Sequence, residues 1–194
     1  MARTPSNMLA LGTEAPAFEL PDTISGKKLS LEAHRGVKGT VIFFICNHCP
    51  FVLHVKEALV EVANEFKEKG VSFIAISSND VHNYPQDGPD QMKEFAEQSH
   101  FPFPYLYDES QETARAYEAA CTPDIYVFDG YLSLVYRGQL DDSRPGNEIP
   151  VTGADLRYAL MNLLEGKEIS PVQKPSIGCN IKWKENKEKV QSKK

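Results

Sequence analysis

The stretch that decides the fold is Thr40-Val-Ile-Phe-Phe-Ile45, which runs directly into Cys46-Asn-His-Cys49-Pro50. A continuous run of β-branched and aromatic residues is typical of a strand buried on both faces. Apolar residues at helical spacing follow from Val52 to Phe66. Pro50 suits the first turn of that helix, where a missing N–H leaves no bond unmade. The two cysteines are therefore expected at the junction between a strand and a helix.

The segments around this junction predict an α/β protein. Val71–Ile76, after a helix stop at Gly70, indicates a second buried strand, so the centre is a βαβ unit. Open α/β sheets carry their chemistry beyond the carboxyl ends of such strands. The other expected elements are a weak hairpin over 15–20 and 28–31, a loop over 77–89, helices over 90–99 and 111–120, a short apolar segment over 103–107, a hairpin over 124–129 and 132–137, and a last helix that Thr152 and Asp155 cap and Gly166 ends.

Length and composition indicate one globular domain. The chain has 194 residues, 41% of them apolar and 25% charged. A net charge of −6 disfavours nucleic acid as a partner, because phosphate binding needs a basic surface. No apolar run is long enough for a transmembrane helix or a signal peptide, so we expect no membrane association and a cytoplasmic location. The last ~10 residues are rich in lysine and are expected to be frayed.

Four cysteines are too sparse for a disulfide framework in a chain of this length. Two of them, Cys46 and Cys49, form a Cys-x-x-Cys pair, which in a cytosolic protein is usually redox-active or metal-binding. The start of a helix favours negative charge and so favours a thiolate. Cys46, which precedes the helix, is expected to be the more exposed of the two and to attack a disulfide. Cys49 is expected to be shielded and to resolve the mixed disulfide.

His48 lies between the two cysteines, and its position allows two roles. A protonated imidazole would stabilise the Cys46 thiolate and make the pair more oxidising. The other interpretation is a loop histidine that faces solvent. Asn47 carries little information.

The motif resembles a known family once a downstream segment is added. Phe43-Phe-Ile-Cys46-Asn-His-Cys49-Pro50, together with Thr122-Pro123-Asp124, is similar to the thioredoxin-like proteins of the redoxin superfamily, which groups alkyl hydroperoxide reductase and thiol-specific antioxidant proteins, and within it to a Cys-Asn-His-Cys-Pro subgroup. The resemblance implies a thioredoxin-like α/β fold, with a central mixed sheet flanked by helices, an N-terminal β-hairpin, a helical insertion and a C-terminal tail. We place the domain at 8–170 and the tail at 171–194.

The resemblance also implies that Thr122-Pro123 is a cis peptide facing the cysteines, with Thr122 offering backbone groups to an extended substrate by strand addition. Two departures from the related patterns stand out. Thr40 occupies the place of the buried carboxylate of thioredoxin, so the proton acceptor for Cys49 is unassigned. The threonine that positions peroxide in peroxiredoxins is also missing, because its place holds Phe43 when counted back from Cys46 and holds Cys46 when counted back from Cys49. This argues against efficient peroxide reduction.

The other two cysteines are left with open roles. Cys121 lies two residues before Pro123 and is either a buried, inert thiol or a neighbour of the pair. Cys179 follows the last helix and is either structural, an extra resolving thiol or a partner of Cys121. A group of polar residues is a candidate rim of the site or an ordinary polar loop: Arg137, Gln139, Asp141, Asp142 and Arg144.

The function predicted from these residues is thiol–disulfide oxidoreduction by the Cys46/Cys49 couple, with His48, Thr122 and Pro123 in support. Its partners would be a disulfide-containing protein or small molecule and a recycling reductant, without a cofactor. The first alternative is a peroxiredoxin-like thiol peroxidase. The second is a metal-binding module built from Cys46, Cys49, Cys121 and a histidine, a weak signal because there is only one Cys-x-x-Cys.

Overall fold

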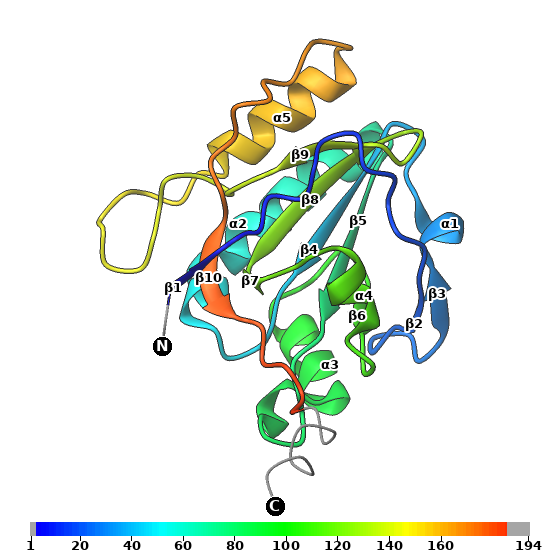
Figure 1. Ribbon diagram of the computed structural model, residues 1–194, viewed down its shortest axis with the longest axis vertical. Helices are drawn as coiled ribbons and strands as arrows, with labels where there is room; N and C mark the ends of the chain where they lie inside the picture. Colours follow the sequence, from blue (N-terminus) through cyan, green and yellow to red (C-terminus); the bar gives the residue numbers. More distant parts are fainter. Residues whose placement is uncertain (1–2, 186–194) are drawn as a thin grey trace, which may run out of the picture.

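The computed structural model describes residues 3–185 as an α/β fold built around a central sheet (Figure 1). The strands are β1 (Arg3–Pro5), β2 (Glu19–Pro21), β3 (Lys28–Ser30), β4 (Gly39–Phe44), β5 (Val71–Ser77), β6 (Tyr105–Tyr107), β7 (Cys121–Thr122), β8 (Asp124–Asp129), β9 (Leu134–Arg137) and β10 (Ile177–Asn180). The helices are α1 (Leu31–His34), α2 (Pro50–Phe66), α3 (Pro89–Gln98), α4 (Glu112–Ala116) and α5 (Ala154–Leu164), with 3-10 turns η1 (Lys67–Lys69) and η2 (Pro85–Asp87).

The central sheet has the strand order β6-β5-β4-β8-β9. Strand β4 runs parallel to β5 and antiparallel to β8, so the sheet is mixed, as the resemblance implied. All six residues of β4 are buried, which agrees with its uninterrupted apolar sequence. The predicted hairpins form as β2–β3 and β8–β9. The unit β4–α2–β5 is the βαβ unit predicted from the cysteine junction.

Two apolar clusters pack on the two faces of this sheet. Phe43 and Ile45 point to one face, where side chains of α2, α3 and α5 cover them together with Cys46 and Cys49. Ile42 and Phe44 point to the other face, which the N-terminal segment and α4 cover. In Figure 1 the N-terminal segment and α4 lie in front of the sheet and α2 lies behind it. The cysteine pair therefore belongs to the core on the α2 face.

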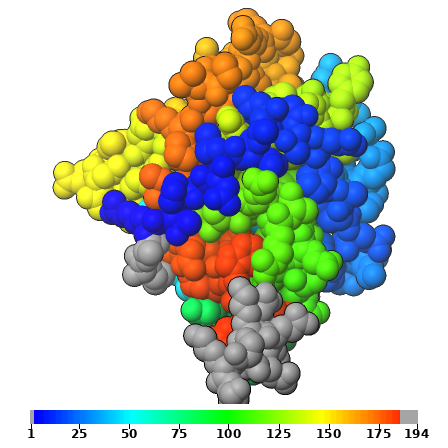
Figure 2. Space-filling model, viewed as in Figure 1, coloured from blue at the N-terminus to red at the C-terminus, as the bar shows by residue number. Residues whose placement is uncertain are grey.

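A second, small sheet joins the two ends of the described chain. Its order is β1-β10-β7, with both pairings antiparallel. Figure 2 shows the N-terminal segment and the C-terminal residues side by side on one face, next to the segment that leads into β7. This sheet was not predicted, and it brings the region after α5 to the strand that precedes Pro123.

Two helices differ from their sequence patterns. The expected helix over 111–120 is shorter, because α4 ends at Ala116 and Glu118 turns the chain with φ 52° toward β7. The expected Thr152/Asp155 cap on α5 forms only in part, because the Thr152 hydroxyl accepts from the Ala154 N–H at 3.3 Å but the Asp155 carboxylate accepts from the Gln139 side chain at 2.7 Å. The buried carboxylate of Asp141 instead accepts hydrogen bonds from the N–H groups of Thr152 and of Gly153, which is the N-cap residue, both at 2.7 Å. A carboxylate distant in sequence thus satisfies the two N–H groups that lead into the helix, and the Leu140 carbonyl accepts from the Asp155 and Leu156 N–H groups in its first turn.

No helix within residues 3–185 is long and apolar enough to cross a membrane. The predicted fraying of the last ~10 residues falls almost entirely on 186–194, which lie outside the described residues.

Candidate active site

The two cysteines of the motif lie together where β4 gives way to α2. Cys49 is the N-cap residue of α2, and Pro50 occupies the first turn, as predicted. The Cys46 and Cys49 thiols are hydrogen-bonded to each other, and neither is in a disulfide bond. The carboxyl end of a central strand and the start of a helix thus set the two sulfurs within exchange range.

The expected difference in exposure between Cys46 and Cys49 is absent, because both cysteines are buried. Cys46 is 1% exposed and Cys49 is 0% exposed. The loop after β5 folds over the motif and covers it: the Asn47 side chain donates to the Gln86 carbonyl at 2.9 Å, and the Tyr84 ring stacks on His48 with centroids 5.7 Å apart. The sequence marked this loop as polar but gave no sign that it closes on the cysteines.

The Thr122–Pro123 peptide is cis and faces the pair, as the resemblance implied. The Thr122 hydroxyl lies 3.5 Å from Cys46 Sγ, and the Thr122 carbonyl oxygen lies 3.1 Å from Cys49 Sγ. Thr122 therefore contacts both sulfurs. Its backbone, however, is already paired with Cys179 of β10, so the edge expected to receive an extended substrate is occupied by the chain itself.

A buried carboxylate that the sequence analysis missed stands beside Cys46. Asp87, in η2, has no exposed surface, and its Oδ2 lies 2.7 Å from Nδ1 of His48. Its other contacts are the Asn47 N–H at 2.9 Å and the Asn79 side-chain amide at 2.8 Å. His48 is therefore oriented by Asp87 rather than facing solvent freely. A usable signal existed, because loops that follow neighbouring parallel strands meet at the same edge of a sheet.

The hydrogen bonds around the pair converge on Cys49. Donation from the Cys46 thiol, with further donation from Cys179, Thr122 and the Val52 N–H, lowers the pKa of Cys49 to about 4. The Thr122 carbonyl can accept a hydrogen bond only from the protonated Cys49 thiol, so it favours a higher pKa of Cys49. The groups that donate to Cys49 are more numerous than this one acceptor. Donating this hydrogen bond to Cys49 raises the pKa of Cys46, and burial and the charge of Asp87 act in the same direction. In the reduced protein the negative charge resides on Cys49.

This charge distribution should be visible in a pH titration of the reduced protein. Because the pKa of Cys49 is lowered to about 4, the ultraviolet absorbance of a thiolate should persist from neutral pH down to about pH 5 and disappear near pH 4. Cys49→Ser should remove this transition, whereas Cys121→Ala should keep it. A wild-type midpoint near the ordinary thiol pKa would contradict the assignment.

The metal set suggested by the sequence is not assembled. Among residues 3–185, the only cluster of potential ligands is Cys46, His48 and Asp87, whose ligand atoms lie within 4.8 Å of one another. Cys121 is not part of it. The Asp87 oxygens already accept from Asn47 and Asn79, which suits a carboxylate that orients His48.

A cleft lies beside Pro123, on the side of the long loop that precedes α5. Of the five candidate rim residues, Gln139 and Arg144 line it. Arg144 donates to the Gln139 side-chain oxygen, and Arg137 turns away to the Leu9 carbonyl at 2.7 Å. The cleft therefore has one cationic and one amide side chain within reach of the cis-proline. Asp141 caps α5, and exposed Asp142 pairs with Lys174 at 2.7 Å.

Similarity to known proteins agrees with this geometry. Residues 11–137, which carry the cysteine motif, the cis-proline and the whole central sheet, match the AhpC/TSA family. The chain belongs to this family. The AhpC/TSA match ends at Arg137, so α5 and β10 lie beyond it.

Two solved structures resemble this AhpC/TSA protein over nearly its whole length. An uncharacterised conserved protein from Geobacillus kaustophilus is 58% identical, with a TM-score of 0.94 over 96% of this chain and 98% of that one. A hypothetical protein from Sinorhizobium meliloti is 44% identical, with a TM-score of 0.92 over 94% and 100%. The thioredoxin domain of a Bacteroides vulgatus thiol–disulfide oxidoreductase is 20% identical, with a TM-score of 0.59 over 78% and 99%, and shows the thioredoxin-like fold. No curated protein matches the chain.

The carboxylate nearest in sequence to the cis-proline is not the missing proton acceptor of this AhpC/TSA protein. Asp124 lies on the sheet face of Tyr126 and Phe44, opposite to the cysteine pair. It accepts from the Ala120 N–H and the Tyr126 hydroxyl, both at 3.1 Å. Burial nevertheless raises the pKa of Asp124 to about 6. Thr40 accepts from the Gly36 N–H and has a structural role.

Asp124 should make the stability of the protein fall between about pH 4 and pH 7. A carboxyl with a raised folded pKa stabilises the fold when it is protonated, and this contribution is lost as pH rises through about 6. The shift corresponds to about 3 kcal/mol. Relative to Asp124→Asn, the wild type should lose about that much unfolding free energy over this range in urea titrations. A wild-type-minus-variant difference that is constant with pH would contradict this prediction.

Proposed function

We propose that the protein is a thiol–disulfide oxidoreductase that cycles Cys46 and Cys49 between a dithiol and a disulfide. The observation that carries the proposal is the contact of the two sulfurs beside the cis Thr122–Pro123 peptide, at the end of a central strand. Membership of the AhpC/TSA family supports a thiol-based reaction in general.

In the proposed reaction, Cys46 attacks one sulfur of the substrate disulfide. As the new bond forms, the Cys46 proton passes to the hydrogen-bonded Cys49 sulfur, and one substrate thiolate leaves. That substrate thiolate then accepts the proton from Cys49, which leaves Cys49 as a thiolate. The Cys49 thiolate then attacks Cys46, which forms the Cys46–Cys49 disulfide and releases the second substrate thiolate. A dithiol reductant reverses the oxidation by the same two exchanges.

Two features support Cys46 as the attacking cysteine. Cys46 lies beside His48 and Asp87, and the His48 side chain is 19% exposed, so this side of the pair is the nearer one to solvent. Cys49 is held at the helix start by the donors that stabilise its thiolate, which suits a resolving group. Both sulfurs are buried, so a substrate reaches Cys46 only when the cover formed by 78–88 moves aside.

The proposal is tested by combining a reductase assay with disulfide mapping. The reduced protein should reduce insulin disulfides in the presence of dithiothreitol, and after one equivalent of substrate disulfide, mass spectrometry should find a Cys46–Cys49 linkage. A protein that consumes no disulfide and never forms this linkage would refute the proposal.

A second candidate, a thiol peroxidase, is favoured by the AhpC/TSA family match. Phe43 contributes no hydroxyl where peroxiredoxins have a threonine, so we place this activity second. Peroxide-dependent consumption of dithiothreitol, with a sulfenic acid at Cys46, would place it first. The absence of both would remove it.

A further inference from the structure

Three thiols, and not only two, meet at the site. The Cys179 thiol is hydrogen-bonded to the Cys49 sulfur, which also accepts a hydrogen bond from the Cys46 thiol. Cys179 is 2% exposed and packs in the same apolar cluster as the pair. Cys49 is thus the sulfur that both of the other thiols contact.

The strand that carries Cys179 lies where the sequence led us to expect a substrate. In β10, Cys179 pairs with Thr122, the residue before the cis-proline, in antiparallel register. An extended substrate adding to this edge would present its own disulfide to the pair from that register. The chain therefore offers Cys179 to Cys49 much as a bound substrate would offer its sulfur.

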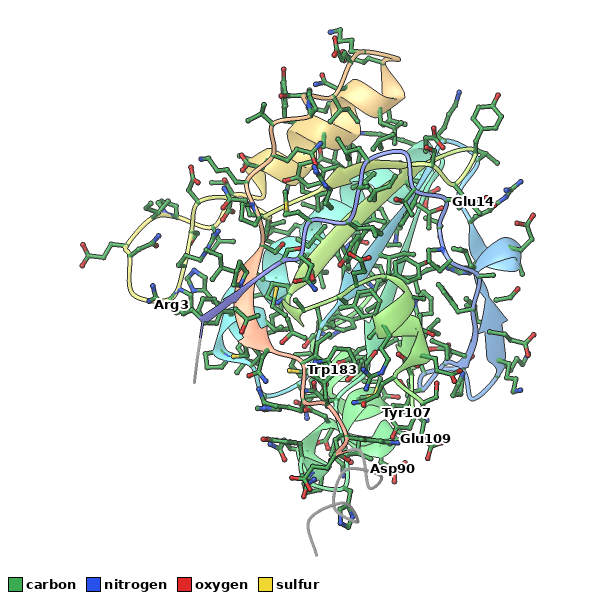
Figure 3. All side chains as sticks on the ribbon, in the orientation of Figure 1. Arg3, Glu14, Asp90, Tyr107, Glu109 and Trp183 are labelled. Carbon is green, nitrogen blue, oxygen red and sulfur yellow. The ribbon has the colours of Figure 1, made fainter. Side chains whose placement is uncertain are left out.

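This strand is fixed on both sides. On its outer edge, Arg3 of β1 pairs with Cys179. Beyond its end, the Lys182 N–H donates to the Asn79 side chain at 2.9 Å, and the Lys182 carbonyl accepts from the Asp80 N–H at 2.8 Å. In Figure 3, Trp183 lies just past β10, near the end of the molecule that holds Tyr107. These contacts hold Cys179 in place against the loop that covers the motif.

We propose that Cys179 is a third redox-active cysteine, which replaces Cys46 as the disulfide partner of Cys49 by thiol–disulfide exchange. This inference rests on the proposed function, because the Cys46–Cys49 disulfide is its starting point. The Cys179 thiolate attacks Cys49 Sγ, the Cys49–Cys179 bond forms, and the Cys46–Cys49 bond breaks. Cys46 leaves as a thiolate and takes up the proton that Cys179 lost. No net oxidation occurs, so no further oxidant is required.

The order of events follows from the charges at the site. In the reduced protein, burial and the negatively charged Cys49 raise the pKa of Cys179 to about 12, so Cys179 stays protonated. Formation of the Cys46–Cys49 disulfide removes the charge on Cys49 and with it the part of this effect that Cys49 causes. The pKa of Cys179 therefore falls once the first disulfide has formed, while burial continues to raise it. The exchange then frees Cys46 for a new attack while the oxidised state is held at Cys49–Cys179.

Cys121 provides a matched control. It precedes Thr122 in β7, but its Sγ donates to the Pro123 carbonyl at 3.5 Å and toward the Ser176 carbonyl at 4.0 Å. It is as buried as Cys179 and belongs to the same strand pairing, yet its thiol donates to backbone carbonyls and not to Cys49. Variants Cys121→Ala and Cys179→Ala therefore differ mainly in whether a thiol next to Cys49 is lost.

The test maps disulfides after limited oxidation. Reduced wild type, Cys46→Ser, Cys179→Ala and Cys121→Ala are treated with oxidised glutathione or diamide, quenched in acid, alkylated and digested for mass spectrometry. Wild type and Cys121→Ala should contain both Cys46–Cys49 and Cys49–Cys179, and Cys179→Ala only the first. In oxidised wild type, Cys49–Cys179 should exceed Cys49–Cys121 about ten-fold or more, because only Cys179 is held in contact. Cys46→Ser cannot form the starting disulfide and should form little of either linkage. Circular dichroism checks that each variant is folded.

The outcomes separate this inference from the proposed function. If wild type forms Cys46–Cys49 and reduces insulin, but neither wild type nor folded Cys121→Ala ever forms Cys49–Cys179 and Cys179 is recovered alkylated, the third-thiol proposal is overturned and the function stands. If Cys49–Cys179 forms but Cys46–Cys49 never does, the proposed function fails, and with it the exchange step.

Discussion

Replacing Cys46 with serine should lower the rate of insulin-disulfide reduction by roughly three orders of magnitude or more, as expected for loss of an attacking group. A serine hydroxyl at this position cannot form the mixed disulfide, and the low pKa of Cys49 does not compensate, because Cys49 is enclosed by its donors and has no exposed surface. The measurement is turnover with dithiothreitol as reductant, with single-turnover reaction of the reduced protein with a chromogenic disulfide as a second readout.

Cys49→Ser is the matched variant. It should react once with a substrate disulfide and then retain it as a stable mixed disulfide on Cys46. Cys179 should not release this adduct, since its contact is with Cys49. Cys121→Ala should keep nearly full activity. If Cys46→Ser traps substrate on Cys49 while Cys49→Ser is inert, the roles of the two cysteines are reversed. This outcome is worth testing because Cys49 carries the thiolate.

The strand, the helix and the cysteine junction could be predicted because their determinants are local. The apolar run of β4, the helical spacing of α2 and the proline in its first turn all lie within 40–66. The cis peptide before Asp124 could be inferred only through a resemblance, and the resemblance was correct. Local pattern therefore located the two sulfurs, though it did not reveal what surrounds them.

The surroundings of the pair depend on contacts between distant segments. Exposure of Cys46 was predicted from its place before the helix, but a loop more than thirty residues later in the chain buries it and supplies Asp87. Asp141 likewise accepts from the Thr152 and Gly153 N–H groups that lead into α5. In each case a carboxylate in a polar, Pro- and Gly-containing stretch finds backbone or ring N–H groups that no local pattern connects with it.

Cys179 shows this limit most clearly. From the sequence it could have been structural, a partner of Cys121 or an extra resolving thiol, because nothing fixes the register of a four-residue strand after the last helix. The register emerges only when β10 enters between β1 and β7 and pairs with Thr122. One signal was present: Gly178 directly precedes Cys179, and a glycine inside a strand often marks a close approach of another backbone.

Gly178→Ala should destabilise the protein by about 3 kcal/mol and detach β10 from its register, because overpacking against backbone cannot relax by a rotamer change. A Cβ at this position would lie 2.0 Å from the Thr122 carbonyl oxygen, the atom that also contacts Cys49. The melting temperature should fall by roughly 6–12 °C. The share of oxidised protein carrying Cys49–Cys179 should fall in parallel, and the midpoint of the Cys49 titration should rise as one donor is lost.

Gly166→Ala separates this effect from the general consequence of losing a glycine. Gly166 has φ +65° and open space around its missing side chain, so alanine there should cost about 1 kcal/mol and leave both site readouts unchanged. If Gly178→Ala melts like Gly166→Ala and still forms Cys49–Cys179, then β10 can carry a side chain against the Thr122 carbonyl. The close backbone approach would then not be what brings Cys179 to Cys49. A stable Gly178→Ala protein that loses only the Cys49–Cys179 linkage would show instead that the register of β10 serves the thiol contact more than the fold.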